Sequence, residues 1–84
     1  MMTDYITFRS VTAAQRGERV LLGAGIRCVL RRTPRWMEEQ GCGYCLRLPE
    51  NRMEEALTLL RENGLNWRRV YHGKPDGTLE ERTV

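Results

Sequence analysis

The sequence contains only one histidine, His72, among its 84 residues, and no apolar run approaches the ~20 residues that a membrane-spanning helix needs. Its polar start, Met1–Asp4, lacks the order of charged and then apolar residues of a signal peptide. A single histidine leaves no set of nucleophile, histidine and acid, and no phosphate-binding loop or recognisably spaced carboxylate pair occurs. We therefore expect a cytoplasmic protein without membrane contact or cofactor, and an accessory protein rather than an enzyme.

Cysteine is also scarce, with Cys28, Cys42 and Cys45 as the three examples. An odd number at this density is unlike the evenly paired disulfide framework of small secreted domains. Apolar residues make up 40% of the chain and charged residues 30%, which is typical of a soluble globular domain. The net charge of +3 permits an anionic partner without requiring one.

Apolar residues recur with the periods of strands and helices along most of the chain. The expected elements are a strand over 4–9, a helix over 12–24, strands over 26–31 and 43–48, a helix over 51–63 and a strand over 67–73. This β-α-β-β-α-β order predicts a ferredoxin-like α+β fold, in which two helices cover one face of a four-stranded antiparallel sheet. We take residues 1–84 as one domain and expect the polar segment 74–84 to be a loose tail.

Local signals place the helix ends and one close contact. Thr12 and Asn51 are the expected N-caps, because Gln15 and Glu54 follow them at the spacing of a capping box. Gly17 lowers the helix propensity of its segment by about 1 kcal/mol relative to alanine. We expect the compensation to be a close approach of this helix to the sheet.

The most distinctive stretch is Gly41-Cys42-Gly43, which follows an irregular loop and opens a predicted strand. A cysteine between two glycines has little steric cover, and glycine backbones can turn their amides toward an incoming anion. Arg32 and Arg35 lie upstream in the same loop, where their charges would favour a thiolate at Cys42. The pattern is typical of an accessible, reactive cysteine, although an exposed thiol without a function would show the same neighbours.

Cys42 and Cys45 also form a C-x-x-C pair, which leaves two further interpretations open. A redox dithiol needs Cα atoms within ~7 Å, whereas three residues of extended chain span roughly 10 Å, so a turn between the cysteines would be required. A zinc site would combine the pair with Cys28 and His72, but a second spaced pair of ligands is missing. We prefer Cys28 as a small core residue and expect no metal.

Four stretches together resemble a known family: Tyr5–Ser10, Ala13-Ala14, Thr33–Arg35, and Gly41–Gly43 with an apolar strand behind it. They are similar to the selenium/sulfur carrier-like family of small stand-alone or fused domains. The resemblance covers the chain from about Tyr5 to Tyr71, and its most specific part is the Pro-Arg…Cys-Gly segment.

The resemblance implies that Cys42 holds a persulfide or selenopersulfide. The cargo would pass from a donor protein, such as a cysteine desulfurase, to an acceptor protein. Arg35 would be the basic residue of the family's Pro-Arg element. Cys45 is an additional thiol, which would either resolve the persulfide to a disulfide or simply belong to the strand. We therefore expect a carrier that works through Cys42.

A second candidate site follows from the alternation of the predicted strands. Arg31, Cys45 and Arg47 alternate with core residues and should lie on the sheet face away from the helices. Other residues expected on this face are Tyr5, Arg9, Arg27 and Val29. The face would be solvated, or would bind an acidic protein, a second copy of the chain as a homodimer, or RNA. The aromatic pattern of RNA-binding sheets is absent, which disfavours nucleic acid. The alternative function is therefore a non-enzymatic binding or regulatory module that uses this face.

Overall fold

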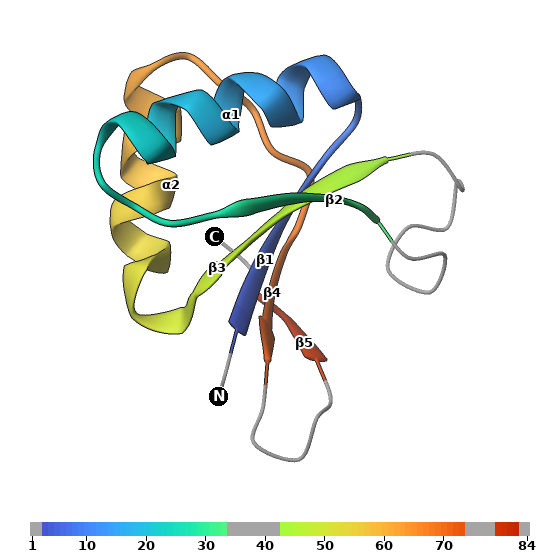
Figure 1. Cartoon of the computed structure of the whole chain (residues 1–84). Helices are drawn as coiled ribbons and strands as arrows, with labels where there is room; N and C mark the ends of the chain where they lie inside the picture. The colour runs from blue at the N-terminus through green and yellow to red at the C-terminus, as the bar shows by residue number, and fades with distance from the viewer. Residues whose placement is uncertain (1–2, 34–42, 74–78, 83–84) are drawn as a thin grey trace.

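The computed structural model describes residues 3–33, 43–73 and 79–82 (Figure 1). Its elements are β1 (Thr3–Phe8), α1 (Val11–Gly23), β2 (Val29–Arg32), β3 (Tyr44–Pro49), a 3-10 turn η1 (Glu50–Arg52), α2 (Met53–Glu62), β4 (Val70–Gly73) and β5 (Leu79–Arg82). The strands form one antiparallel sheet in the order β2-β3-β1-β4-β5, and α1 and α2 pack on the same face of it (Figure 1). Neither helix is long and apolar enough to cross a membrane, in the part of the chain that the structure describes.

The predicted ferredoxin-like α+β fold is confirmed. The central strand β1 pairs with β3 on one side and β4 on the other. The unit β1-α1-β2 therefore crosses over β3, and the unit β3-α2-β4 crosses over β1. The β1–β3 register places Ile6 opposite Leu46 and Thr7 opposite Cys45. Because side chains alternate between the two faces, this register sets Ile6 and Leu46 toward the helices and Thr7 and Cys45 away from them.

The sheet has five strands rather than the four that we expected. β5 pairs with β4, from Val70 opposite Arg82 to Gly73 opposite Leu79, and it lies within the segment 74–84 that we expected to be a loose tail. The sequence of Leu79–Arg82 shows no apolar alternation, so periodicity gave no signal for this edge strand, which its backbone ladder to β4 defines. Residues 74–78 and 83–84 lie outside the described residues.

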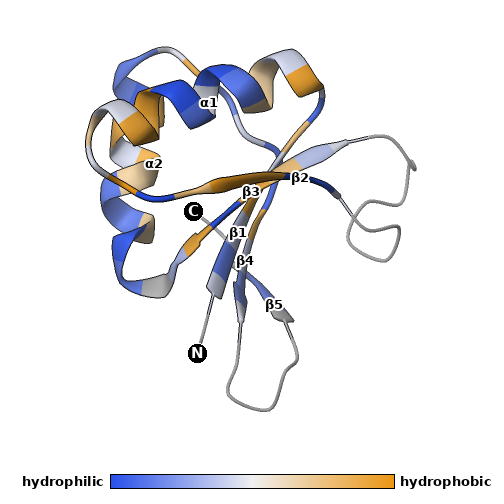
Figure 2. Ribbon diagram, in the orientation of Figure 1, coloured by the Kyte–Doolittle hydropathy of each residue, from blue (hydrophilic) through white to orange (hydrophobic). Residues whose placement is uncertain are grey.

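The core lies between the sheet and the two helices. Ile6, Phe8, Leu46 and Leu60 are fully buried in it, and apolar residues alternate with polar ones along both helices (Figure 2). Gly17 of α1 faces this core: a Cβ there would lie 3.1 Å from Phe8 Cζ and 3.2 Å from Leu46 Cδ1. The close approach of helix and sheet that we expected at Gly17 is therefore confirmed.

Two predicted N-caps are wrong. Ser10, not Thr12, caps α1, because its Oγ accepts a hydrogen bond from the Ala13 amide at 3.1 Å. The N-cap thus lies two residues earlier than the capping-box spacing indicated. At α2, Asn51 lies inside η1, and the N-cap residue Arg52 makes no side-chain cap hydrogen bond. Arg52 instead pairs with Glu55 at 2.9 Å.

The second and fourth strands begin later than predicted. After α1 the chain turns at Gly25, whose φ is +81°, and the Ile26 amide donates to the Leu21 carbonyl at 2.9 Å. Residues 26–28 therefore complete the helix exit before β2 begins at Val29. Residues 67–69 likewise precede β4, which begins at Val70.

Candidate functional site

The ends of β2 and β3 form the base from which the cysteine-bearing segment extends. The last β2–β3 pair joins Arg32 to Tyr44, and beyond it the Thr33 amide donates a hydrogen bond to the Gly43 carbonyl at 3.0 Å. Gly43 is buried. Three of the predicted site residues, Arg35, Gly41 and Cys42, lie outside the described residues. Of the predicted Gly-Cys-Gly stretch, the structure therefore describes only its last residue, at this base.

Cys45 lies on the sheet face away from the helices, yet its side chain is only 1% exposed. It is a free thiol. Burial raises its pKa, and the Thr33 hydroxyl and the Arg31 guanidinium offset part of this rise. The Thr33 Oγ1 atom is itself buried and forms no hydrogen bond of ordinary geometry, although it lies near enough to the thiol to favour the thiolate. In this conformation Cys45 is neither accessible nor readily ionised.

Cys28 lies on the opposite side of the sheet, in the core beneath α1. Its Sγ contacts the Glu18 carbonyl oxygen at 4.0 Å, and burial together with the Glu18 charge raises the pKa of this thiol to about 11. The interpretation of Cys28 as a small core residue is confirmed by its place in the hydrophobic cluster. Because Cys28 and Cys45 lie on opposite faces of the sheet, they cannot share a metal ion.

The single histidine is separated from Cys45 by the central strand β1, where His72 pairs with Asp4 and Cys45 pairs with Thr7. His72 Nδ1 lies 2.7 Å from Asp4 Oδ1, and the Asp4 side chain is 2% exposed. Both residues lie on the helix side of the sheet, at the end where β1 begins. In the described part of the chain, no three His, Cys, Asp or Glu residues are arranged to hold a metal ion.

The arginine face is arranged as the alternation predicted. Arg47 faces Val29 on one side and Tyr5 on the other, and the same row continues to Tyr71 and Glu81. Another row brings Arg31 beside Cys45. The expected position of Arg31 and Arg47 on the side away from the helices is therefore confirmed. Arg31 is exposed and Arg47 is half-buried.

Around the α2–β4 connection the structure shows a basic groove that the sequence patterns did not predict. Two adjoining hollows, of about 420 and 730 Å³, share the lining residues Gly64, Leu65, Asn66, Trp67 and Arg68. Arg61 of α2 borders the smaller hollow, and Arg9, Ala13 and Arg69 border the larger one. The only signal in the sequence was Trp67, a large aromatic residue among polar neighbours.

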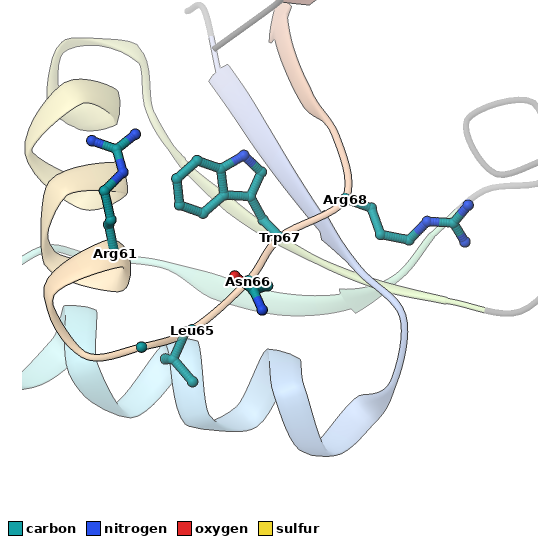
Figure 3. A pocket seen from close by; sticks show the side chains of 6 residues that line it. Arg61, Leu65, Asn66, Trp67 and Arg68 are labelled. Atoms are coloured by element: carbon teal, nitrogen blue, oxygen red, sulfur yellow. The ribbon is translucent and has the colours of Figure 1, made fainter.

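Within the groove, the Arg61 guanidinium lies over the Trp67 ring, 5.6 Å from its centroid. Figure 3 shows Arg61 and Trp67 projecting to the same side of the connection, whereas the Arg68 side chain extends away from them. Trp67 is half-buried and packs against the hydrophobic core. The groove thus combines an apolar floor with several arginines.

The fold and these sites define a class: a small ferredoxin-like α+β domain whose two buried thiols lie on opposite faces of the sheet and whose β2 and β3 flank a further cysteine. The chain belongs to the family described as "Putative Se/S carrier protein-like", whose model matches residues 4–72. The resemblance stated for about Tyr5 to Tyr71 is therefore confirmed as family membership. No curated protein and no solved structure was found to match the chain.

Proposed function

We propose that this protein carries sulfur or selenium as a persulfide or selenopersulfide on Cys42 and passes it from one protein to another. Family membership supports the cargo. The proposal depends on one observation: the burial and raised pKa values of Cys28 and Cys45 leave Cys42 as the carrier thiol. A carrier thiol must be accessible and must ionise near neutral pH, because the thiolate is the nucleophile.

Neither Cys28 nor Cys45 meets these requirements. Cys28 is 9% exposed and its pKa is raised to about 11, whereas Cys45 is 1% exposed and its pKa is also raised. Both are protonated and covered at neutral pH in the folded protein. Cys42 is the remaining cysteine of the three. Its glycine neighbours and the arginines upstream are the sequence features that favour access and ionisation.

The transfer step requires no external oxidant. The Cys42 thiolate attacks the terminal, sulfane sulfur of a persulfide on the donor protein. A new S–S bond forms at Cys42 while the S–S bond of the donor breaks, and the donor cysteine leaves as a thiolate. Release to the acceptor repeats the same exchange, with Cys42 as the leaving thiolate. A selenopersulfide is transferred by the same exchange at selenium.

Charge at the base of the segment supports a protein partner with an acidic surface, such as a cysteine desulfurase acting as the donor. Arg31 and Arg32 are exposed at the end of β2, immediately before Thr33, and Arg47 follows on the same face as Arg31. Positive charge around a nucleophilic thiol favours the thiolate and attracts an acidic partner. We assign Cys45 a structural role, because burial and a raised pKa do not suit a resolving thiol.

Intact-mass measurement after incubation with a cysteine desulfurase and cysteine tests the proposal. We expect a gain of ~32 Da that dithiothreitol removes, which corresponds to one persulfide sulfur. Cys42→Ser should lose the gain, whereas Cys45→Ala and Cys28→Ala should keep it. A gain that persists in Cys42→Ser, or that disappears only in Cys45→Ala, would contradict the assignment of the carrier thiol.

A second candidate function uses the arginine face without sulfur chemistry. One observation favours it: Val29 is 53% exposed on the edge strand β2, beside Arg47. An apolar residue at an exposed edge, next to a cation, suits a protein partner or a homodimer formed through this face. Such a binding module should gain no mass in the desulfurase experiment, and the dimer should be detected by analytical ultracentrifugation.

A further inference from the structure

The basic groove around the α2–β4 connection lies at the end of the sheet that bears the cysteine segment. The Arg68 amide donates to the Thr7 carbonyl at 2.7 Å, and the Thr7 amide donates to the Arg69 carbonyl at 2.8 Å. Thr7 is paired with Cys45, and the next residue of β1, Phe8, is paired with Tyr44. The connection therefore enters the sheet beside β1, and β1 lies between it and β3, the strand that starts directly after Gly43.

The charge of this groove is of one sign. Arg9, Arg61, Arg68 and Arg69 border it, and none of the described residues that line either hollow is acidic. Arg69 also lies 3.8 Å from Glu81, outside the lining. Arg9 and Arg61 are exposed, so their guanidinium groups can pair with carboxylates while their stems stay in contact with the protein.

The floor of the groove is apolar. Ala13, Leu65 and Trp67 line it, and all three pack against the hydrophobic core while remaining partly exposed. The larger hollow is partly open to solvent, unlike the enclosed cavities that hold small molecules. Its shape and chemistry suit a chain segment that lies across it, with carboxylates at the rim and an apolar side chain against Leu65 and Trp67.

A protein segment fits these observations better than RNA does. Single-stranded nucleic acid is held by stacking of its bases on exposed aromatic faces. The only aromatic ring among the residues lining the groove is that of Trp67, and the Arg61 guanidinium already covers one of its faces. On the sheet itself Tyr71 is 7% exposed, so its ring offers no stacking surface. Carboxylates, by contrast, need only the guanidinium groups at the rim.

We infer that this groove, built from Arg9, Arg61, Leu65 and Trp67, is the docking site for an acidic segment of a partner protein that contains an apolar residue. The identification of that partner as a donor or acceptor of the cargo rests on the proposed function. A segment seated here lies at the same end of the sheet as Gly43, the residue that follows Cys42, so docking brings the partner close to the carrier cysteine.

The test uses a fluorescein-labelled peptide rich in Asp and Glu with one central Phe, titrated with the full-length Cys42→Ser protein and followed by fluorescence anisotropy. We expect saturable binding that weakens as salt rises. The variant Arg9→Gln/Arg61→Gln should bind about tenfold more weakly, since each arginine offers a charge-assisted hydrogen bond. The matched control Arg19→Gln/Arg27→Gln removes the same charge from exposed residues outside the groove and should bind within about twofold of the parent.

Absence of saturable binding overturns the inference, because no docking site then exists. An equal loss of affinity in both double variants also overturns it, because binding then depends only on net charge. Tighter binding of labelled oligouridine than of the peptide at the same salt assigns the groove to RNA instead. A peptide with Phe replaced by Ser should bind more weakly, and equal binding would contradict the role of Leu65 and Trp67. Cys42→Ser cannot carry cargo, so these results are independent of the mass experiment. Failure of either experiment therefore leaves the other conclusion intact.

Discussion

The Thr33 amide donates a hydrogen bond to the Gly43 carbonyl at 3.0 Å, and this bond joins the two ends of the segment that contains Cys42. It extends the β2–β3 ladder by one residue beyond the pair of Arg32 and Tyr44. The same Thr33 side chain lies next to the buried Cys45 thiol. The base of the segment is therefore held by regular sheet pairing, and the covered Cys45 thiol lies beside it.

The three cysteines should differ in reactivity. We expect Cys42 to be alkylated first at neutral pH, because Cys28 and Cys45 are buried and their pKa values are raised. Brief treatment with a low dose of iodoacetamide, followed by peptide mapping, measures the order. In urea all three should react at similar rates. Labelling of Cys45 or Cys28 before Cys42 in the folded protein would remove the main chemical support for the carrier thiol.

Two buried threonines should respond in opposite ways to replacement by valine. Thr7 Oγ1 accepts a hydrogen bond from the Arg69 amide at 2.9 Å, so Thr7→Val should lower the free energy of unfolding by about 1–3 kcal/mol. Thr33 Oγ1 is buried without a hydrogen bond, so Thr33→Val should leave stability unchanged or raise it by up to ~1 kcal/mol. Urea denaturation of the two variants provides the comparison. Equal losses of stability would mean that both hydroxyls are bonded alike.

Two glycines of α1 should also differ when replaced by alanine. At Gly17 the new methyl group would lie 3.1 to 3.4 Å from Phe8, Leu46 and Leu60, which are fully buried. Overpacking should outweigh the gain of about 1 kcal/mol in helix propensity, with a net loss of about 1 kcal/mol. Gly23→Ala is the control, because nothing lies within 4 Å of the added atom, and it should be neutral or stabilising. The thermal unfolding midpoints of both variants measure the difference. A Gly17→Ala variant that is more stable than the parent would contradict the close packing of α1 against the sheet.

Stability should fall at alkaline pH through Cys28. The folded protein raises the pKa of this thiol from 9.0 to about 11, so the folded state retains the proton more strongly than the unfolded state does. Its contribution is therefore complete below pH 9.0 and is lost as the pH rises toward about 11, ~3 kcal/mol in all. Urea unfolding of wild type and Cys28→Ala at several pH values isolates the effect. If the free energy of unfolding falls equally with pH in both proteins, Cys28 does not cause the loss of stability.

The arginine face should affect the rate of sulfur transfer. Changing Arg31 and Arg47 to Glu reverses two charges on the face away from the helices, where neither residue belongs to the core. We expect slower persulfide transfer from a cysteine desulfurase and a weaker dependence of the rate on salt, with Cys42 alkylation unchanged. The variant Arg16→Glu/Arg19→Glu, at two exposed residues of α1, is the control for net charge. Rates that match between the two variants would leave Arg31 and Arg47 as ordinary solvated surface.

Much of the fold follows from local patterns in the sequence. Ile6 and Phe8 alternate with polar residues, and Tyr44, Leu46 and Leu48 do the same, which was enough to predict which face of β1 and of β3 meets the helices. The helix ends were less predictable. Thr12 had a capping-box partner in the sequence, but Ser10 alone accepts the hydrogen bond of the first turn. Capping depends on the backbone conformation of a single residue, which spacing does not reveal.

What the sequence by itself determined is the order of the first four strands and the two helices, the facing of residues along β1, β2 and β3, and the motif around Cys42, because these depend on neighbours along the chain. The tertiary structure alone decided the burial of Cys45, the pairing of β5 with β4, and the groove in which Arg9 and Arg61 border two adjoining hollows beside Trp67. Apolar alternation along a strand predicts the sheet face on which a side chain lies, but it does not predict which residues cover that face. An edge strand without an apolar face and a groove assembled from distant segments depend on contacts between residues far apart in the chain, which leave no periodic signal.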